Sequence, residues 1–276
     1  MPATVHVYVF DGYADWEPAF AMAGIRDPQY QRQPGRWQVQ TVGQRDGVAV
    51  RSKGGLAVLP DVAMDALHAD DSALLILPGG DSWVDTPELH RGAIDTASHF
   101  FDAGVPVAAI CGATAGLARA GWLDDRPHTS NAAAYLKGTG YQGAAHYRDM
   151  PAVRGPGLIT AGGMAPLEFA REIFIELGLY DDEVLEAWYQ LYKTGKSEHF
   201  ARMVRAAEEP ARQLPATQRG PRPGKVTRPS GPGKPTAQRR AEREEIDEAT
   251  GATASETTRD AHVSVRSKRS GGAKAN

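Results

Sequence analysis

The stretch Val105-Pro-Val-Ala-Ala-Ile-Cys-Gly-Ala-Thr-Ala-Gly-Leu-Ala118 carries most of the information about the fold. Residues 105–110 are apolar and predict a buried strand, whereas residues 114–120 are small, predict a helix and are followed by Gly121 as a stop. Cys111 lies at the turn between the two. This arrangement is typical of a nucleophile elbow, where a tight turn needs small neighbours such as Gly112 and Ala113.

Cys111 is the only cysteine of the chain, which excludes an intramolecular disulfide and a multi-cysteine zinc site. A cysteine at a helix N-terminus lies near the positive end of the helix dipole, which favours the thiolate over the thiol. The alternative is an inert cysteine at the end of a core strand, because free cysteine is among the most buried residue types.

Strands and helices alternate on both sides of this stretch. Expected strands cover residues 5–10, 37–42, 74–77, 105–110 and 158–161, with a hairpin at 48–50 and 56–59. Expected helices cover residues 15–26, 87–103, 114–120, 165–177, 181–193 and 197–207, with a helical turn at 64–68. The central strands are continuously apolar, so we expect an α/β domain whose mainly parallel sheet is covered on both faces.

Three polar or glycine-rich segments follow expected strands, at the sheet edge where ligands bind in such folds: residues 11–17, 78–81 and 111–114. Glu17 lies in the first, where a carboxyl can bond a thiol and exchange a proton; the alternative is a solvated acid in a helix's first turn. Gly79 and Gly80 lie in the second, where backbone N–H groups can face an oxyanion; the alternative is an ordinary turn.

These segments resemble the ThiJ/PfpI superfamily, whose fold is flavodoxin-like and similar to class I glutamine amidotransferases. The resemblance covers about residues 4–179 and includes G-L-I-T-A-G-G-M-A-P-L-E-F-A at residues 157–170. It implies that Cys111 is the elbow nucleophile and that Glu17 contacts its sulfur. It also implies that Gly79 and Gly80 form the backbone-donor loop, completed by the Gly112 N–H, and that the protein is a homodimer.

Superfamily members include glyoxalases or deglycases, peptidases, hydratases, chaperones and redox sensors, and departures from their patterns narrow the choice. Peptidase-like members carry His directly after the cysteine, where this chain has Gly112. Glyoxalase-like members place a His where Asn131 stands, and His128 lies about three residues early. No late His-x-Glu pair is present, which disfavours glutamine hydrolysis.

A thiol that attacks a carbonyl needs a nearby base, for which the sequence offers Glu17, Asp15, His128 and His146. We expect a cysteine-dependent hydrolase or lyase for a small carbonyl or amide-type substrate, with Asn131 and His128 near that substrate. His128 alternatively has only a structural role. The competing functions are a peroxide-sensing thiol in a stress-response protein and a small-ligand binding module.

Three further residues, and the absence of certain motifs, bear on the site or the location of the protein. Asp81 and Trp83 are candidates for the pocket mouth, or for a solvated loop, and His6 is expected to be a satisfied histidine in the sheet. No cofactor or metal motif is present. With neither a secretory signal layout nor a membrane-length apolar run, we expect a soluble, cytoplasmic protein.

The 276 residues divide into two unlike parts. Residues 1–204 carry 16 Lys/Arg and 25 Asp/Glu, a net charge of −9, and contain every aromatic residue. Residues 205–276 carry 15 Lys/Arg and 9 Asp/Glu, a net charge of +6, and are rich in Pro and Gly. We therefore predict one folded domain followed by a disordered tail. Any weak nucleic-acid contact is expected from the tail and not from the acidic domain.

Overall fold

The computed structural model describes residues 2–208. The predicted tail lies outside the described residues from residue 209 onward, whereas residues 205–208 complete the last helix. None of the helices in this part of the chain is long and apolar enough to cross a membrane.

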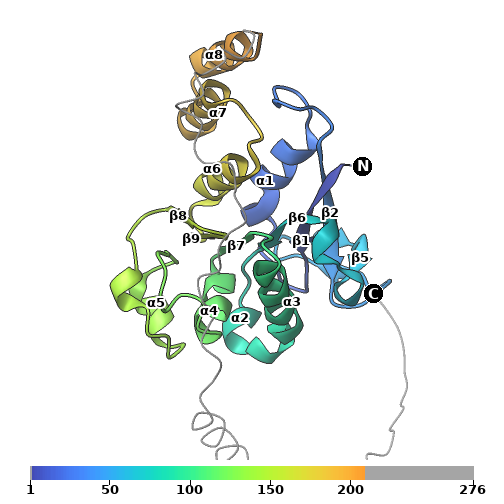
Figure 1. Ribbon diagram of the computed structural model, residues 1–276, viewed down its shortest axis with the longest axis vertical. Coiled ribbons are helices and arrows are strands. Elements are labelled where there is room, and N and C mark those ends of the chain that lie inside the picture. The colour runs from blue at the N-terminus through green and yellow to red at the C-terminus, as the bar shows by residue number, and fades with distance from the viewer. Residues whose placement is uncertain (1, 209–276) are drawn as a thin grey trace, which may run out of the picture. The chain divides into compact units, whose positions relative to one another are not determined.

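A seven-stranded sheet forms the centre of the domain, in the order β5-β2-β1-β6-β7-β9-β8 (Figure 1). Its strands are β1 (Ala3–Tyr8), β2 (Trp37–Gly43), β5 (Val62–Ala63), β6 (Ser72–Leu77), β7 (Val107–Ile110), β8 (Ala152–Gly155) and β9 (Leu158–Ala161). All neighbours run parallel except the edge strand β8, which runs antiparallel to β9. The predicted hairpin is confirmed as a separate pair, β3 (Val50–Arg51) and β4 (Ala57–Val58).

Helices cover both faces of the sheet, so the predicted three-layer, flavodoxin-like α/β sandwich is confirmed. The helices α1 (Trp16–Arg26) and α6 (Pro166–Leu177) pack together on one face, and α7 (Asp182–Thr194) and α8 (Ser197–Glu208) continue from α6. On the other face lie α2 (Ser82–Asp85), α3 (Arg91–Asp102) and α4 (Gly112–Arg119), with α5 (Ala133–Lys137) beside α4 (Figure 1).

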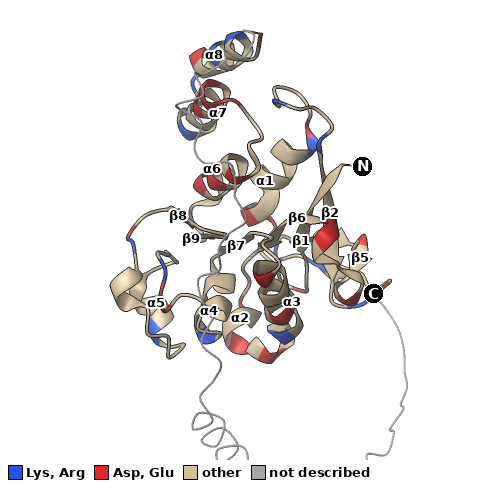
Figure 2. Cartoon of the chain, in the orientation of Figure 1, with Lys and Arg blue, Asp and Glu red and all other residues tan. Residues whose placement is uncertain are grey.

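The alternation of side chains along the buried strands produces one hydrophobic core on each face. In β6, Leu74 and Ile76 point into the core with α1 and α6, whereas Leu75 and Leu77 point into the core with α3 and α4. All four are completely buried, as expected for a strand covered on both sides. Figure 2 shows Asp and Glu on helices of both layers with fewer Lys and Arg among them, in keeping with the negative charge of residues 1–204.

Several elements differ from the sequence prediction. The expected helix over residues 87–103 is a 3-10 turn, Pro87–His90, followed by α3, because His90 turns inward and is buried. The edge strand β8 was not predicted, since it is short and carries the exposed Arg154. The helix α4 begins at Gly112, directly after Cys111, and not at residue 114.

Candidate active site

Cys111 occupies a strained turn between β7 and α4. Its backbone has φ 57° and ψ −122°, in the half of dihedral space that side chains other than glycine avoid. Its N–H donates to the Ala161 carbonyl of β9 at 3.0 Å, which holds the turn to the sheet. Such a conformation costs about 1–3 kcal/mol and is typical of functional sites. The predicted elbow geometry is therefore present.

Gly112 has no room for a side chain. A Cβ added to it would lie 2.6 Å from the Gly80 carbonyl oxygen and 3.1 Å from the Trp83 side chain. The loop after β6 thus packs directly on the first residue of α4, and a His at this position is excluded by backbone contact. This contact gives a physical reason for the absence of the histidine found in peptidase-like relatives.

Glu17, in the first turn of α1, is completely buried. Its Oε2 accepts the Gly79 N–H at 2.6 Å, whereas Oε1 has no hydrogen-bond partner of ordinary geometry among the described residues. Burial raises the pKa of the Glu17 carboxyl, and the Gly79 N–H and Cys111 only partly offset this effect. A buried carboxylate with a raised pKa is a stronger base than an exposed one.

The Cys111 thiol lies beside this carboxyl, and its pKa is raised to about 11. Burial is the main cause and the negative charge of Glu17 is the second, and together they outweigh the Asn131 amide and the Gly112 N–H, which lower the pKa. The start of α4 therefore acts in the predicted direction through the Gly112 N–H, but the expected net preference for the thiolate is wrong for the resting site. Cys111 is held as a thiol next to an acceptor for its proton.

Asn131 closes the other side of the sulfur. Its Nδ2 donates to Cys111 Sγ at 3.4 Å, and its Oδ1 accepts the Gly163 N–H at 2.8 Å. The expectation that Asn131 lies near the reacting group thus agrees with its position. Gly163 also lines the site, although the sequence analysis did not single it out. A Cβ at Gly163 would lie 2.8 Å from Cys111 Sγ and 3.1 Å from Glu17 Oε1. The signal was Gly162-Gly163 directly after β9, a fourth glycine-rich strand end.

The backbone-donor loop differs from the expectation at Gly79. Because its N–H is bonded to Glu17, it is not available to a substrate, and the expected substrate-binding role of Gly79 needs correction. The Gly80 N–H donates no hydrogen bond to any described residue, and the Gly112 N–H faces the sulfur at the start of α4. Gly80 and Gly112 therefore remain as the candidates for the predicted pair of backbone donors.

A model of the DJ-1/PfpI family matches residues 3–176. The chain belongs to the DJ-1/PfpI family. The resemblance drawn from the elbow and the strand-end motifs is thereby confirmed.

Relatives of this DJ-1/PfpI chain agree with the assignment. A Bacillus subtilis protein named uncharacterized protease YoaZ is 36% identical over 203 residues, 72% of this chain and 95% of the relative. A thiJ/pfpI family protein from Bacillus anthracis has 36% identity and a TM-score of 0.69, covering 75% of this chain and 97% of that structure. The DJ-1 superfamily protein Atu0886 from Agrobacterium tumefaciens has 37% identity and a TM-score of 0.62, covering 70% and 98%.

Lys53 adds a positive charge to the DJ-1/PfpI site that sequence reasoning missed. The residue lies between β3 and β4, and its Nζ bonds the exposed Asp81 carboxylate at 2.8 and 2.9 Å. It is also near enough to Glu17 to lower the pKa of that carboxyl. Only the folded hairpin brings Lys53 to the site, so no local motif marks it. Asp81 is exposed, which fits both alternatives given for it, whereas Trp83 is buried and its Nε1 donates to the Pro78 carbonyl, so Trp83 fits neither a pocket mouth nor a solvated loop.

The other candidate bases of the DJ-1/PfpI chain have different partners. Asp15 accepts the Ser52 hydroxyl at 2.6 Å. His128 is completely buried, with Nδ1 bonded to the Arg126 carbonyl at 2.9 Å and its ring packed edge-on against Tyr141 and Tyr147. Within residues 2–208, no hydrogen bond joins His128 to Cys111. The alternative that His128 has only a structural role therefore fits its position better than a role in substrate binding. Among these candidate bases, Glu17 is therefore the one that the fold places beside Cys111.

Two further expectations concern groups away from the sulfur. His146 supplies its carbonyl to the His128 N–H and makes no contact with Cys111 among the described residues. His6 is buried, with Nδ1 2.8 Å from the Ser72 hydroxyl, which confirms a satisfied histidine in the sheet. In the described part of the DJ-1/PfpI chain, no three His, Cys, Asp or Glu side chains gather into a set that could hold a metal.

Replacing Asn131 with Ala is expected to raise the pKa of Cys111 further, because its amide is the strongest contact that favours the thiolate. The loss of one hydrogen bond corresponds to roughly 0.7 pH unit. The pH dependence of Cys111 alkylation by iodoacetamide should shift upward from its midpoint near 11 by about this amount. An unchanged or lower midpoint would contradict the contact.

Proposed function

We propose that this DJ-1/PfpI protein is a cysteine-dependent enzyme for a small carbonyl or amide-type substrate, with Cys111 as nucleophile. The observation that supports this proposal best is the pairing of the Cys111 thiol with the buried, otherwise unpartnered Oε1 of Glu17 at a strained elbow. Such a pair is costly to bury and is typical of functional sites.

In the first step, Cys111 Sγ attacks the electrophilic carbon and its proton passes to Glu17 Oε1. A bond forms between sulfur and carbon, and the π electrons of the carbonyl move onto oxygen as an oxyanion. Because the pKa of the Glu17 carboxyl is raised, it lies closer to the pKa of the Cys111 thiol, and proton transfer from the thiol to the carboxylate is less unfavourable. In the second step, the Glu17 carboxyl returns the proton. An aldehyde adduct takes the proton on its oxyanion and becomes a neutral hemithioacetal. For an amide, the carbonyl re-forms, the C–N bond breaks, the leaving amine takes the proton, and water then hydrolyses the thioester left on Cys111.

The N–H groups of Gly80 and Gly112 would stabilise that oxyanion, since both lie at the elbow and neither is used by the sheet. Asn131 is held by Gly163 and would orient the substrate or a water next to the sulfur. Lys53 supplies positive charge toward Glu17 and the developing anion.

The second candidate, a peroxide-sensing thiol, has weaker support. Peroxide reacts with the thiolate, and a cysteine with a pKa near 11 holds little thiolate at neutral pH. Peptidase activity, suggested by the printed names of the two Bacillus subtilis relatives, is disfavoured by the absence of a His at Gly112. A ligand-binding module would need neither the elbow strain nor the Glu17 base.

The test compares the full chain with its Cys111→Ser variant on methylglyoxal, small amides and a peptide panel. Turnover of a carbonyl or amide by the parent, lost in the variant, supports the proposal. Turnover that survives in the variant rules out covalent thiol chemistry. If nothing is turned over and mass spectrometry finds sulfinic acid on Cys111 after mild peroxide, the sensor function is favoured instead.

The substrate is thus a small molecule in this proposal, and no cofactor takes part in the steps above. A homodimer, a cytoplasmic location and weak nucleic-acid contact by residues beyond 208 stay predictions. Sedimentation of the full chain and of a chain truncated at residue 208, with and without DNA at low salt, would test the first and the last.

A further inference from the structure

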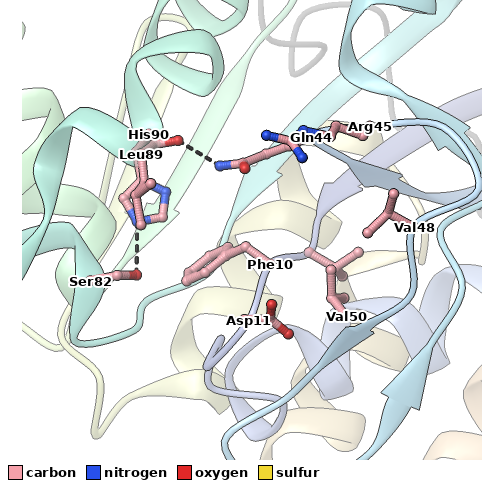
Figure 3. Close-up of a pocket in the computed structure, with 10 residues that line it drawn as sticks. Phe10, Asp11, Gln44, Arg45, Val48, Val50, Ser82, Leu89 and His90 are labelled. Carbon is pink, nitrogen blue, oxygen red and sulfur yellow. Dashed lines mark hydrogen bonds between the residues drawn. The ribbon is translucent and has the colours of Figure 1, made fainter. Parts of the chain in front are cut away.

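A cavity lies beside the loop after β6 and does not include the cysteine site. Its volume is about 270 Å³, and Cys111, Glu17 and Asn131 are not among its lining residues. Apolar side chains of Phe10, Val48, Val50 and Leu89 form much of the wall (Figure 3). A ligand that packs against these side chains is expected to have a compact apolar part.

A directed chain of hydrogen bonds fixes the polar wall of this cavity. Gln44 Nε2 lies 2.5 Å from the Leu89 carbonyl, which can only accept, so this atom is the amide donor and also donates to Tyr8 Oη at 2.8 Å. The Tyr8 hydroxyl has its other contact with His90 Nδ1 at 3.2 Å, and we assign its proton to that contact because the other partner, Gln44 Nε2, can only donate. With this assignment, His90 Nε2 carries the ring proton and donates it to Ser82 Oγ at 2.9 Å.

This direction leaves the Ser82 hydroxyl with a proton to donate and no acceptor among the described residues. Burial lowers the pKa of His90 to about 4, so the ring is neutral and the direction of the chain holds near pH 7. Two hydrogen bonds hold the side chain of the exposed Gln44 in place. A bound molecule therefore does not lose free energy by ordering this side chain.

Arg45 gives the cavity its positive charge. It lies next to Gln44 on the cavity wall, and no acidic side chain among residues 2–208 forms an ion pair with it. The acidic lining residue Asp11 accepts the Arg51 N–H, and in Figure 3 its carboxyl points away from Arg45. An unpaired guanidinium over an apolar wall favours a carboxylate.

We propose that this cavity binds a small carboxylate with an apolar body and a second oxygen at the far end. Arg45 pairs with the carboxylate, the body packs on Phe10, Val48 and Val50, and the Ser82 hydroxyl donates to the second oxygen. The occupant is distinct from the substrate of Cys111, because the cavity and the elbow share no group that reacts.

The test uses 4-hydroxyphenylacetate as probe, titrated calorimetrically into the full chain at pH 7, with 4-hydroxyphenylacetamide and phenylacetate as matched comparisons. We expect saturable binding of the acid, at least about tenfold weaker binding of the amide, and a similar loss in Arg45→Gln. Ser82→Ala should weaken the hydroxylated acid by about three- to tenfold and leave phenylacetate unchanged. Arg36→Gln, which removes the same charge far from the cavity lining, should bind as the parent does.

Four results would overturn the proposal: no saturable binding, equal affinity for acid and amide, unchanged affinity in Arg45→Gln, or an equal effect of Ser82→Ala on both acids. Binding that survives in Cys111→Ser supports a site separate from the elbow. Binding lost in that variant places the probe at Cys111 and contradicts the proposal.

Discussion

Glu17→Gln is expected to accelerate alkylation of Cys111 while it abolishes most turnover. The substitution removes a negative charge that raises the pKa of the thiol, and an amide still accepts the Gly79 N–H through its oxygen. A decrease of one pH unit in the pKa of Cys111 gives roughly tenfold more thiolate at pH 8 and about tenfold faster reaction with iodoacetamide.

The same variant cannot accept the proton of Cys111, so the first chemical step loses its base. General-base catalysis contributes about 10²–10⁴-fold, and kcat/KM should fall by this amount on the substrate that the parent turns over. Glu198→Gln is the matched control, because Glu198 lies in the first turn of α8 and is exposed. Slower alkylation together with unchanged turnover would show that Glu17 is not the proton acceptor.

Gly79→Ala is expected to destabilise the whole domain. The new Cβ would lie 2.6 Å from Cys111 Cβ, 2.8 Å from Glu17 Oε2 and 2.9 Å from the Gly112 nitrogen. Two of these contacts are with groups fixed by the elbow, so the loop must move away from α4 and lose its bond to Glu17. Overpacking of this kind costs about 3 kcal/mol, a large part of the stability of a typical domain.

Urea denaturation followed by circular dichroism measures this loss as a lower midpoint at an unchanged slope. Gly92→Ala is the matched control: an added Cβ there meets nothing within 4 Å, and the site lies in α3. That control should keep or gain stability by up to about 1 kcal/mol, because alanine favours helix. Equal urea midpoints for the parent and Gly79→Ala would contradict this prediction, because they would show that the loop accommodates the added methyl group with no loss of stability.

Sequence reasoning identified Cys111 and Glu17 because each lies in a local motif after an expected strand, and Asn131 because it stands where glyoxalase-like members place a His. Three features of the site depend on loops that meet only in the folded chain. They are the hydrogen bond from the Gly79 N–H to Glu17, the close approach of Gly163 to Cys111 and the position of Lys53 near Glu17. The pKa of Cys111 was predicted in the wrong direction for the same reason. A helix end can be recognised from the sequence, but burial and a charge from α1 cannot.

The hydrogen bond between Glu17 and Gly79 joins groups 62 residues apart, and Cys111 comes later still. The reactive centre therefore has no local precursor: α1, the loop after β6 and the elbow after β7 must all be in place before it exists. Its assembly depends on non-local contacts, which slow folding. A nascent or partly folded chain consequently exposes an ordinary cysteine, and the chemistry of this protein begins only with its completed fold.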